Sequence, residues 1–206
     1  PAHRQTLLFS ATISQEVVDV SKRYLKNPVE VSAEVYVDAK KLTQIYYDAQ
    51  DNLKFSLLVH LLKNEKSDLV MIFCNTQRNT DFIAKNLRFS GINALAIHGG
   101  FSQEKRNRTI EQFHLKNIKV LVCTDVASRG LDIKGISHIY NYDIPKDSKD
   151  YIHRIGRTAR AGKDGKVINI VASRDYDNFN KVVNTYDITI TREETPFIEK
   201  VRVVWM

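Results

Sequence analysis

The chain has 206 residues, of which 43% are hydrophobic and 27% charged, and its formal net charge is +7 at pH 7. This composition excludes an intrinsically disordered chain, and the length suffices for one large domain or for one domain with an additional segment. The positive charge favours an acidic partner such as a nucleic acid, although a basic protein without such a partner has the same charge.

The first 42 residues differ in pattern from the rest of the chain. Residues 6–9 predict a short strand, and Ser14 can cap a helix that runs to about Lys26, before Asn27 and Pro28 end it. Residues 29–42 are polar and β-branched with little periodicity, which predicts a linker, placed at 31–42, and a short strand.

From residue 43 to residue 190 the sequence alternates between strand-like and helix-like segments. Strands are expected at about 44–50, 69–74, 93–97, 119–123, 138–142 and 166–172. Helices are expected at about 53–63, 78–88 (closed by Gly91), 103–115 (capped by Ser102) and 175–186, with another between 142 and 166. This alternation predicts an α/β fold in which helices cover both faces of a parallel sheet and ligands bind beyond the carboxyl ends of its strands. The tail at 191–206 contains apolar residues, but its pattern does not tell whether it packs on the domain.

The two cysteines and the length of the apolar runs bear on where the protein works. Cys74 and Cys123 each end an apolar run, which is typical of small core residues in a reducing compartment. No apolar run approaches the ~18 residues of a membrane-spanning helix. We therefore expect an intracellular protein of the cytoplasm, or of the nucleus in a eukaryote, that contacts no membrane.

Residues 151–160, with the sequence Y-I-H-R-I-G-R-T-A-R, contain three arginines spaced three residues apart. On a helix, Arg154, Arg157 and Arg160 would project from nearly one face. Because a guanidinium group stays charged and donates two parallel hydrogen bonds, such a cluster suits phosphate groups. The alternative is a solvated basic face.

Five short blocks together resemble one known family. They are F-S-A-T at 9–12, I-F-C-N-T at 72–76, H-G-G-F-S-Q-E-K-R at 98–106, C-T-D-V-A-S-R-G-L-D-I at 123–133 and the arginine run at 151–160. In this order they resemble the C-terminal half of a DEAD-box RNA helicase, a superfamily 2 ATPase. The resemblance implies a RecA-like C-terminal domain at 43–190, a linker at 31–42, and a remnant of the N-terminal domain at 1–30. The role of the tail at 191–206 stays open.

The resemblance implies an ATP site shared with an N-terminal RecA-like domain. Arg157 and Arg160 correspond to arginine fingers, and Asp132 and Gly130 to nucleotide contacts; alternatively, Asp132 caps a turn. The cofactor would be ATP with Mg²⁺, and the N-terminal domain would hold the Mg²⁺, so that no metal site is expected in this chain. The sequence has neither a G-x-x-x-x-G-K-[ST] loop nor an Asp-Glu-Ala-Asp box. We therefore expect this chain alone to be inactive.

The resemblance also implies contacts with the RNA backbone, which carry no sequence information, so that binding to single-stranded or duplex RNA should tolerate many sequences. The implied RNA-binding residues are Asn75, Thr76, Arg78, Gly99, Gln103, Arg106, Thr124 and Arg129. For Gln103 and Arg106 the alternative is a network on a helix surface. His98 is either a ligand or a structural hydrogen-bond partner.

Coupling between domains would involve Ser10, Thr12, His153 and Arg154. The alternative for Arg154 is an ion pair with a carboxylate such as Asp125 or Asp150. Ala159 stands where many members of the family have glycine, and a methyl group is tolerated there on a helix. Residues 1–30 could expose apolar side chains and form a dimer of the chain, a hypothesis that a monomeric mass in solution would contradict.

These inferences favour one half of an ATP-dependent RNA helicase, whose arginine fingers and RNA contacts couple ATP hydrolysis to RNA unwinding. Two alternatives are a non-catalytic RNA-binding adaptor on the same fold and a superfamily 2 motor that acts on DNA. Arg157, Arg160 and Asp132 argue against the adaptor, since a pure RNA binder has no use for residues that contact ATP.

Overall fold

A computed structural model describes residues 4–9, 15–31, 42–131, 133–159, 164–186 and 188–204, and the chain divides into two compact units, Pro1–Val35 and Tyr36–Met206. None of the helices in these described ranges is long and apolar enough to cross a membrane. The first unit contains helix α1 (Gln15–Tyr24), as predicted.

The strand expected at residues 6–9 is wrong. Residues 4–9 are exposed and have no regular structure, with Phe9 at 87% exposure. An isolated strand leaves its backbone groups unpaired, and the described part of this unit offers no second strand beside it. The predicted strand pattern therefore requires a sheet that the described part of this unit does not contain.

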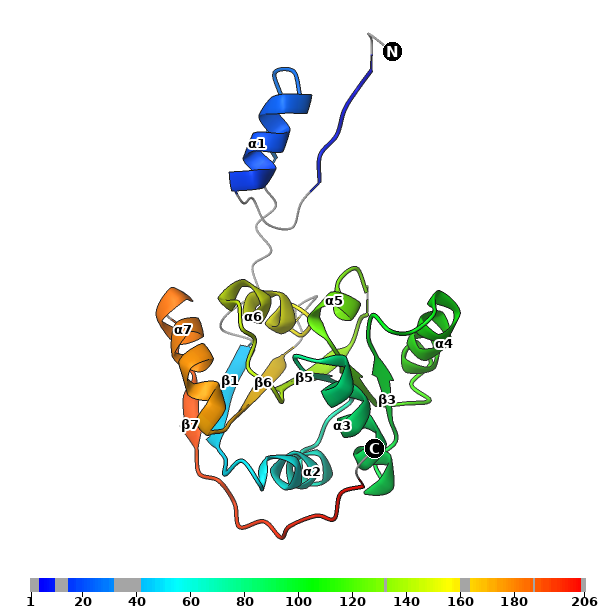
Figure 1. Cartoon of the computed structure of the whole chain (residues 1–206), viewed down its shortest axis with the longest axis vertical. Helices are drawn as coiled ribbons and strands as arrows, with labels where there is room; N and C mark the ends of the chain where they lie inside the picture. Colours follow the sequence, from blue (N-terminus) through cyan, green and yellow to red (C-terminus); the bar gives the residue numbers. More distant parts are fainter. Residues whose placement is uncertain are drawn as a thin grey trace. The chain divides into compact units, whose positions relative to one another are not determined.

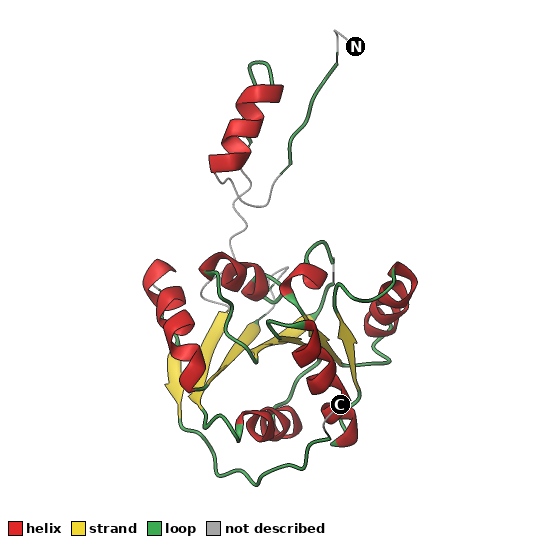
Figure 2. Ribbon diagram, in the orientation of Figure 1, coloured by secondary structure: helices red, strands yellow, loops and turns green. Residues whose placement is uncertain are grey.

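The second unit is built around a seven-stranded, all-parallel sheet with the order β3-β4-β2-β5-β6-β1-β7 (Figures 1 and 2). The strands are β1 (Leu42–Asp48), β2 (Leu69–Phe73), β3 (Ala94–Ile97), β4 (Val120–Cys123), β5 (Ile136–Asn141), β6 (Gly165–Val171) and β7 (Thr191–Glu193). The helices are α2 (Lys54–Asn64), α3 (Gln77–Phe89), α4 (Gln103–His114), α5 (Asp125–Ser128), α6 (Ser148–Ile155) and α7 (Tyr176–Tyr186), with a short 3₁₀ helix, η2 (Ser173–Asp175). The predicted parallel sheet is confirmed.

Helices cover both faces of the sheet, because successive side chains of each strand point to opposite sides. One core cluster contains residues of α2 and α3, and the other contains residues of α4, α5, α6 and α7 (Figure 1). Cys74 and Cys123 are fully buried and lie in different clusters. Burial raises the pKa of both thiols, which keeps them protonated, so the prediction that they are core residues is confirmed.

Short polar side chains begin the two helices that follow β2 and β3. The Thr76 hydroxyl accepts a hydrogen bond from the Asn79 amide at 3.1 Å, and the Ser102 hydroxyl accepts one from the Lys105 amide at 3.3 Å. Gly91 follows α3 with a φ of +82°, the left-handed geometry expected from the sequence. These caps fix where α3 and α4 begin, and therefore where the preceding loops face solvent.

The tail belongs to the domain, a point that the sequence left open. Strand β7 pairs with β1 at the sheet edge, and the tail then runs past α2 towards the end of α3 (Figure 1). Val201 and Val203 pack against the core cluster of α2 and α3. The buried Asn86 side chain binds Val204 twice, accepting from its N–H at 2.7 Å and donating to its carbonyl at 3.1 Å.

The helix expected to hold all three arginines ends too early for that role. Helix α6 stops at Ile155, and Ala159 has a φ of +54°, outside helical geometry. The buried Thr158 hydroxyl donates to the Ile136 carbonyl at 2.7 Å, which turns the chain towards β6. The prediction that Ala159 sits on a helix is wrong, because this turn places it in a conformation that glycine adopts more easily.

Candidate functional site

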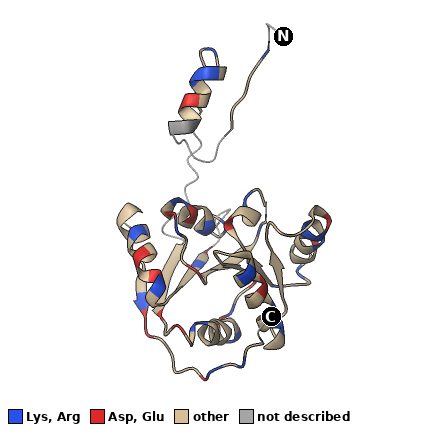
Figure 3. Ribbon diagram, in the orientation of Figure 1, with Lys and Arg blue, Asp and Glu red and all other residues tan. Residues whose placement is uncertain are grey.

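The segments singled out in the sequence come together because the strands that precede them are parallel. Asn75 and Thr76 follow β2, His98 and Gly99 follow β3, and Thr124 follows β4. Parallel strands end at the same edge of a sheet, so these segments share its carboxyl edge. Lys and Arg are present on α4, α6 and α7, interspersed with Asp and Glu (Figure 3).

At this edge a single guanidinium group joins four segments. Arg154 is 1% exposed, and its Nε and Nη2 donate to the two carboxylate oxygens of Asp125 at 2.6 and 2.8 Å. Its Nη1 donates to the Asn141 side chain at 3.0 Å and to the Asp143 carbonyl at 2.6 Å, and Nη2 also donates to the Asn75 side chain at 3.0 Å. We call these five residues the Arg154 cluster. It ties the ends of β2, β4 and β5 to α6.

The Arg154 cluster contains an ion pair between Arg154 and Asp125. The sequence left this pair open as the alternative role of Arg154. All of the nitrogens of the guanidinium group donate inside the domain, and the group also lies 5.0 Å from the centre of the Phe73 ring. Arg154 therefore has no donor directed at a nucleotide in this arrangement. Two other residues of the same motif, His153 and Arg157, are half-buried, whereas Arg154 is buried.

Asn75 turns inward, in contrast to its predicted contact with RNA. Its side chain donates to the Ile144 carbonyl at 2.9 Å and accepts from Arg154, and its amide N–H donates to the Asp143 carboxylate at 3.0 Å. Asp143 also accepts from the Asn79 side chain at 2.7 Å. Asn75 therefore shapes the turn between β2 and α3, while Thr76 and Arg78 beside it are exposed.

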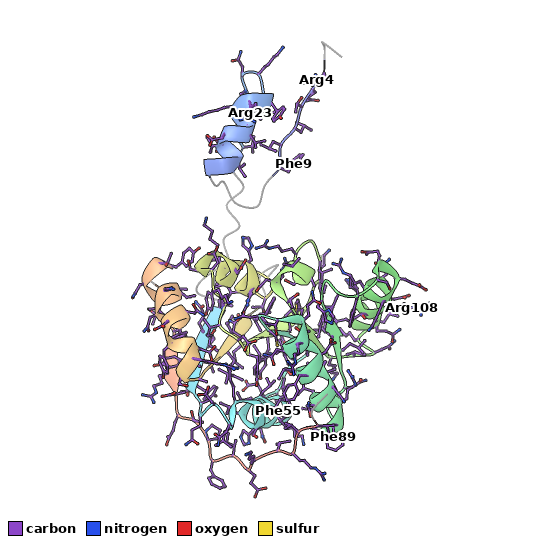
Figure 4. The ribbon with its side chains drawn as sticks, viewed as in Figure 1. Arg4, Phe9, Arg23, Phe55, Phe89 and Arg108 are labelled. Atoms are coloured by element: carbon purple, nitrogen blue, oxygen red, sulfur yellow. The ribbon has the colours of Figure 1, made fainter. Side chains whose placement is uncertain are left out.

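On α4 the predicted RNA contacts form a network along the helix surface. Gln103 donates to the Asn107 side chain at 2.8 Å and accepts from Arg106 at 3.5 Å. The Arg106 Nε atom is buried without a hydrogen-bond partner among the described residues. Arg108 is 75% exposed, pairs with Glu104 one turn before it and points away from the domain (Figure 4). The first turns of α4, which begin four residues after Gly99, thus carry both basic and acidic side chains.

The segment after β4 brings predicted RNA and nucleotide residues next to α6. Thr124 is buried at the start of α5, a short helix that the sequence pattern did not predict. Arg129 is exposed and pairs with Asp150 of α6 at 2.6 Å. Gly130 has a φ of +73°, and a Cβ atom at this position would meet no other described atom within 4 Å. Its backbone conformation, rather than crowding within the domain, therefore requires glycine.

Arg157 lies against the segment that follows Gly130. Its Nη1 donates to the Leu131 carbonyl at 2.7 Å, and the residue is half-buried. The predicted residues Ser10, Thr12, Asp132 and Arg160 lie outside the described residues. The geometry therefore places one of the two expected arginine fingers beside the expected nucleotide-contact segment.

Several residues at this edge were missed by sequence reasoning. Asn141 and Asp143 complete the Arg154 cluster, and Gln77 and Asp81 of α3 contact the loop after β3. Two signals in the sequence could have identified them. Asp143 directly follows a predicted strand at the carboxyl edge. Gln77 and Asp81 are four residues apart, so that on a helix they share one face. In the described part of the chain, no group of three His, Cys, Asp or Glu residues is arranged to hold a metal ion.

Comparison with known proteins identifies the domain. A family model described as the helicase conserved C-terminal domain matches residues 53–162. The DEAD-box ATP-dependent RNA helicase CshA of Bacillus licheniformis is 38% identical over 205 residues, which is 97% of this chain and 41% of the relative. This chain thus spans about two fifths of the length of the curated relatives it matches.

Solved structures agree in fold and in sequence. The E. coli DEAD-box protein SrmB, bound to regulator of ribonuclease activity A, is 37% identical, with a TM-score of 0.71 over 81% of this chain and 99% of that chain. S. cerevisiae Dbp5 bound to RNA and ADP BeF3 is 31% identical, with a TM-score of 0.80 over 91% of this chain and 50% of that chain. The sheet and its helices are therefore RecA-like.

Proposed function

Since the chain belongs to the DEAD-box RNA helicases, whose C-terminal helicase domain it contains, we propose that it works as the C-terminal half of an ATP-dependent RNA helicase. The observation that carries this proposal is that Arg157 donates to the Leu131 carbonyl, next to Gly130 in the segment after β4 and α5, while Thr76, Arg78 and Arg129 are exposed in the segments that follow β2 and β4. One surface would then contact both ATP and RNA, which is what coupling between the two requires.

For ATP, we propose that Arg157 and Arg160 act as arginine fingers on a nucleotide held by an N-terminal RecA-like domain. Arg157 fits this role because its guanidinium group is half-buried and its Nη1 is fixed on Leu131, which leaves the planar fork oriented. Gly130 and Asp132 would contact the nucleotide from the same segment. The N-terminal domain would hold Mg²⁺, and closure of the two domains would bring the arginines to the developing charge.

For RNA, we propose that the loops after β2, β3 and β4 contact the sugar-phosphate backbone. Backbone N–H groups at the start of α3 favour a phosphate, and Arg78 beside them is exposed. The remaining contacts would come from Thr76, Gly99, Gln103, Arg106, Thr124 and Arg129. RNA bound in this way would be bent and locally unwound when the domains close, with little dependence on its sequence.

Coupling would pass through residues that face the N-terminal domain. We assign Ser10, Thr12 and His153 to this role, and we propose that residues 1–30 belong to that domain. The exposed Leu7 and Val20, together with the exposed Phe9 (labelled in Figure 4), fit a segment that another part of the protein covers. When the N-terminal domain is absent, a second copy of this chain would cover these side chains, which would form a dimer. We place the protein in the cytoplasm, or in the nucleus of a eukaryote.

The choice between RNA and DNA as substrate can be tested with matched oligonucleotides. We expect the chain to bind a labelled single-stranded oligoribonucleotide more tightly than the deoxyribonucleotide of the same sequence, measured by fluorescence anisotropy at one salt concentration. A protein that contacts only backbone and sugar can distinguish the two through the 2′-hydroxyl group. Equal affinities would favour a DNA-acting motor of superfamily 2 instead.

A further inference from the structure

We propose that His98 is a positioning residue for the RNA-binding loop between β3 and α4, residues 98–102. It would hold this loop in its RNA-binding conformation when no RNA is bound. The proposal rests on the proposed RNA contact of Gly99 and deepens it, since it names what sets the shape of the loop. The residues that carry it lie on the loop, which directly follows β3, and on α3.

The imidazole ring of His98 contacts both the loop and α3. The residue is only 5% exposed, and its Nδ1 accepts a hydrogen bond from the Gly100 amide at 3.2 Å. On the other side of the ring, Nε2 lies 3.0 Å from the Asp81 carboxylate on α3. The Phe101 ring packs on the imidazole with a centroid separation of 4.0 Å, and the Phe101 amide donates to the His98 carbonyl at 3.1 Å. The ring therefore fixes two consecutive residues after Gly99.

The two contacts of the ring determine its tautomer. A backbone N–H only donates, so Nδ1 must be unprotonated in order to accept from Gly100. The proton of the neutral ring is then on Nε2, where it donates to the Asp81 carboxylate. Asp81 thus favours the one tautomer that can hold the Gly100 amide.

The Gln77 side chain of α3 lies against the same loop. A Cβ atom on Gly100 would lie 2.6 Å from the Gln77 Oε1 atom and 3.1 Å from the His98 Nδ1 atom, so a larger residue would have to displace the end of the Gln77 side chain. Gln77 and Asp81 are four residues apart on α3 and project from one face of the helix. Because α3 begins at the predicted RNA-binding turn, the loops after β2 and β3 are held together. Such preorganisation strengthens binding, since less ordering remains to be done when the ligand arrives.

Two substitutions separate the roles of the two ring nitrogens. An asparagine oxygen can stand near the position of Nδ1, whereas a glutamine amide reaches the position of Nε2. We expect His98→Asn to bind a labelled single-stranded RNA within about twofold of the wild-type chain. We expect His98→Gln to lose about fivefold to tenfold, which corresponds to one hydrogen bond. Both variants lose the packing on Phe101, so they are matched controls for each other.

A third substitution tests the tautomer without changing the histidine. Asp81→Asn puts a side-chain amide opposite Nε2, and that amide can donate to it and favour the proton on Nδ1. The Asp81 side chain is 39% exposed, so the variant should fold. We expect an RNA affinity between those of the wild type and His98→Gln, because the asparagine oxygen can also accept from Nε2 and keep the original tautomer in part of the molecules.

The rate of amide hydrogen exchange at Gly100, measured by NMR without RNA, tests the loop directly. A general loss of stability would raise exchange rates throughout the domain and not at Gly100 alone. Gly100 should stay protected in the wild type and in His98→Asn, and exchange faster in His98→Gln and Asp81→Asn. Equal RNA losses in the two His98 variants, or full RNA affinity in His98→Gln, would overturn the proposal while leaving the proposed function intact. A wild-type chain that binds no RNA would overturn both.

Discussion

Replacing Arg157 by alanine is expected to abolish RNA-stimulated ATP hydrolysis by the full-length protein while leaving its RNA affinity within about twofold. An arginine finger supplies positive charge where negative charge develops on the transferred phosphoryl group, and its removal typically costs about 10³- to 10⁵-fold in rate. Arg157 can be removed without opening the Arg154 cluster, because its Nη1 contacts the Leu131 carbonyl rather than a member of that cluster. The measurement is steady-state ATP hydrolysis at saturating RNA, together with RNA binding by anisotropy.

Two further variants make the result specific. Arg157→Lys keeps the charge but not the planar fork, and it should remain strongly impaired. Arg192→Ala removes the same charge from β7, where the exposed Arg192 pairs with Asp48 of β1, and it should hydrolyse ATP normally. Equal losses of hydrolysis and RNA binding in Arg157→Ala would contradict the assignment of Arg157 as an arginine finger.

Replacing Arg154 by methionine is expected to lower the free energy of unfolding by about 3–5 kcal/mol, because the partners of a fully buried guanidinium group, among them the Asp125 carboxylate, are then left without it. Asp125 would keep its charge in a partly buried place, and the Asn75 and Asn141 oxygens would lose their donor. The measurement is urea unfolding of the chain, followed by circular dichroism.

Arg129→Met is the matched control for this prediction. Arg129 also pairs with an aspartate, Asp150, at 2.6 Å, but its side chain is 56% exposed. Exposed ion pairs contribute little, so this variant should lose less than about 1 kcal/mol. Similar small losses in both variants would show that the Arg154 cluster does not stabilise the domain as its burial indicates.

Most strands and helices of the second unit could be predicted from the sequence because their patterns are local, whereas the short elements α5 and β7 were not predicted. Apolar strands alternate with amphipathic helices, and Ser102 and Gly91 mark helix ends by their own chemistry. The end of α6 could not be found in this way. It depends on a hydrogen bond between Thr158 and the Ile136 carbonyl, two residues far apart in the sequence.

For a related reason, the sequence offered an ion pair with Asp125 as one alternative for Arg154 but could not decide for it, and the inward role of Asn75 was not predicted. Their residue types suit phosphate and RNA, and only the packing of four chain segments shows that their polar atoms bind one another. The tail is a third case, since its place on the domain depends on Asn86, a polar residue buried on α3. In each case the deciding contact joins segments that local periodicity treats separately.

ATP hydrolysis by the full-length protein and by this chain, each with and without single-stranded RNA, tests the central claim most directly. We expect RNA to stimulate hydrolysis by the full-length protein and this chain alone to be inactive, because the ATP site that we propose is formed by both domains. Hydrolysis by this chain alone would contradict the shared site. A full-length protein that binds RNA but never hydrolyses ATP would contradict the helicase proposal and favour an RNA-binding adaptor.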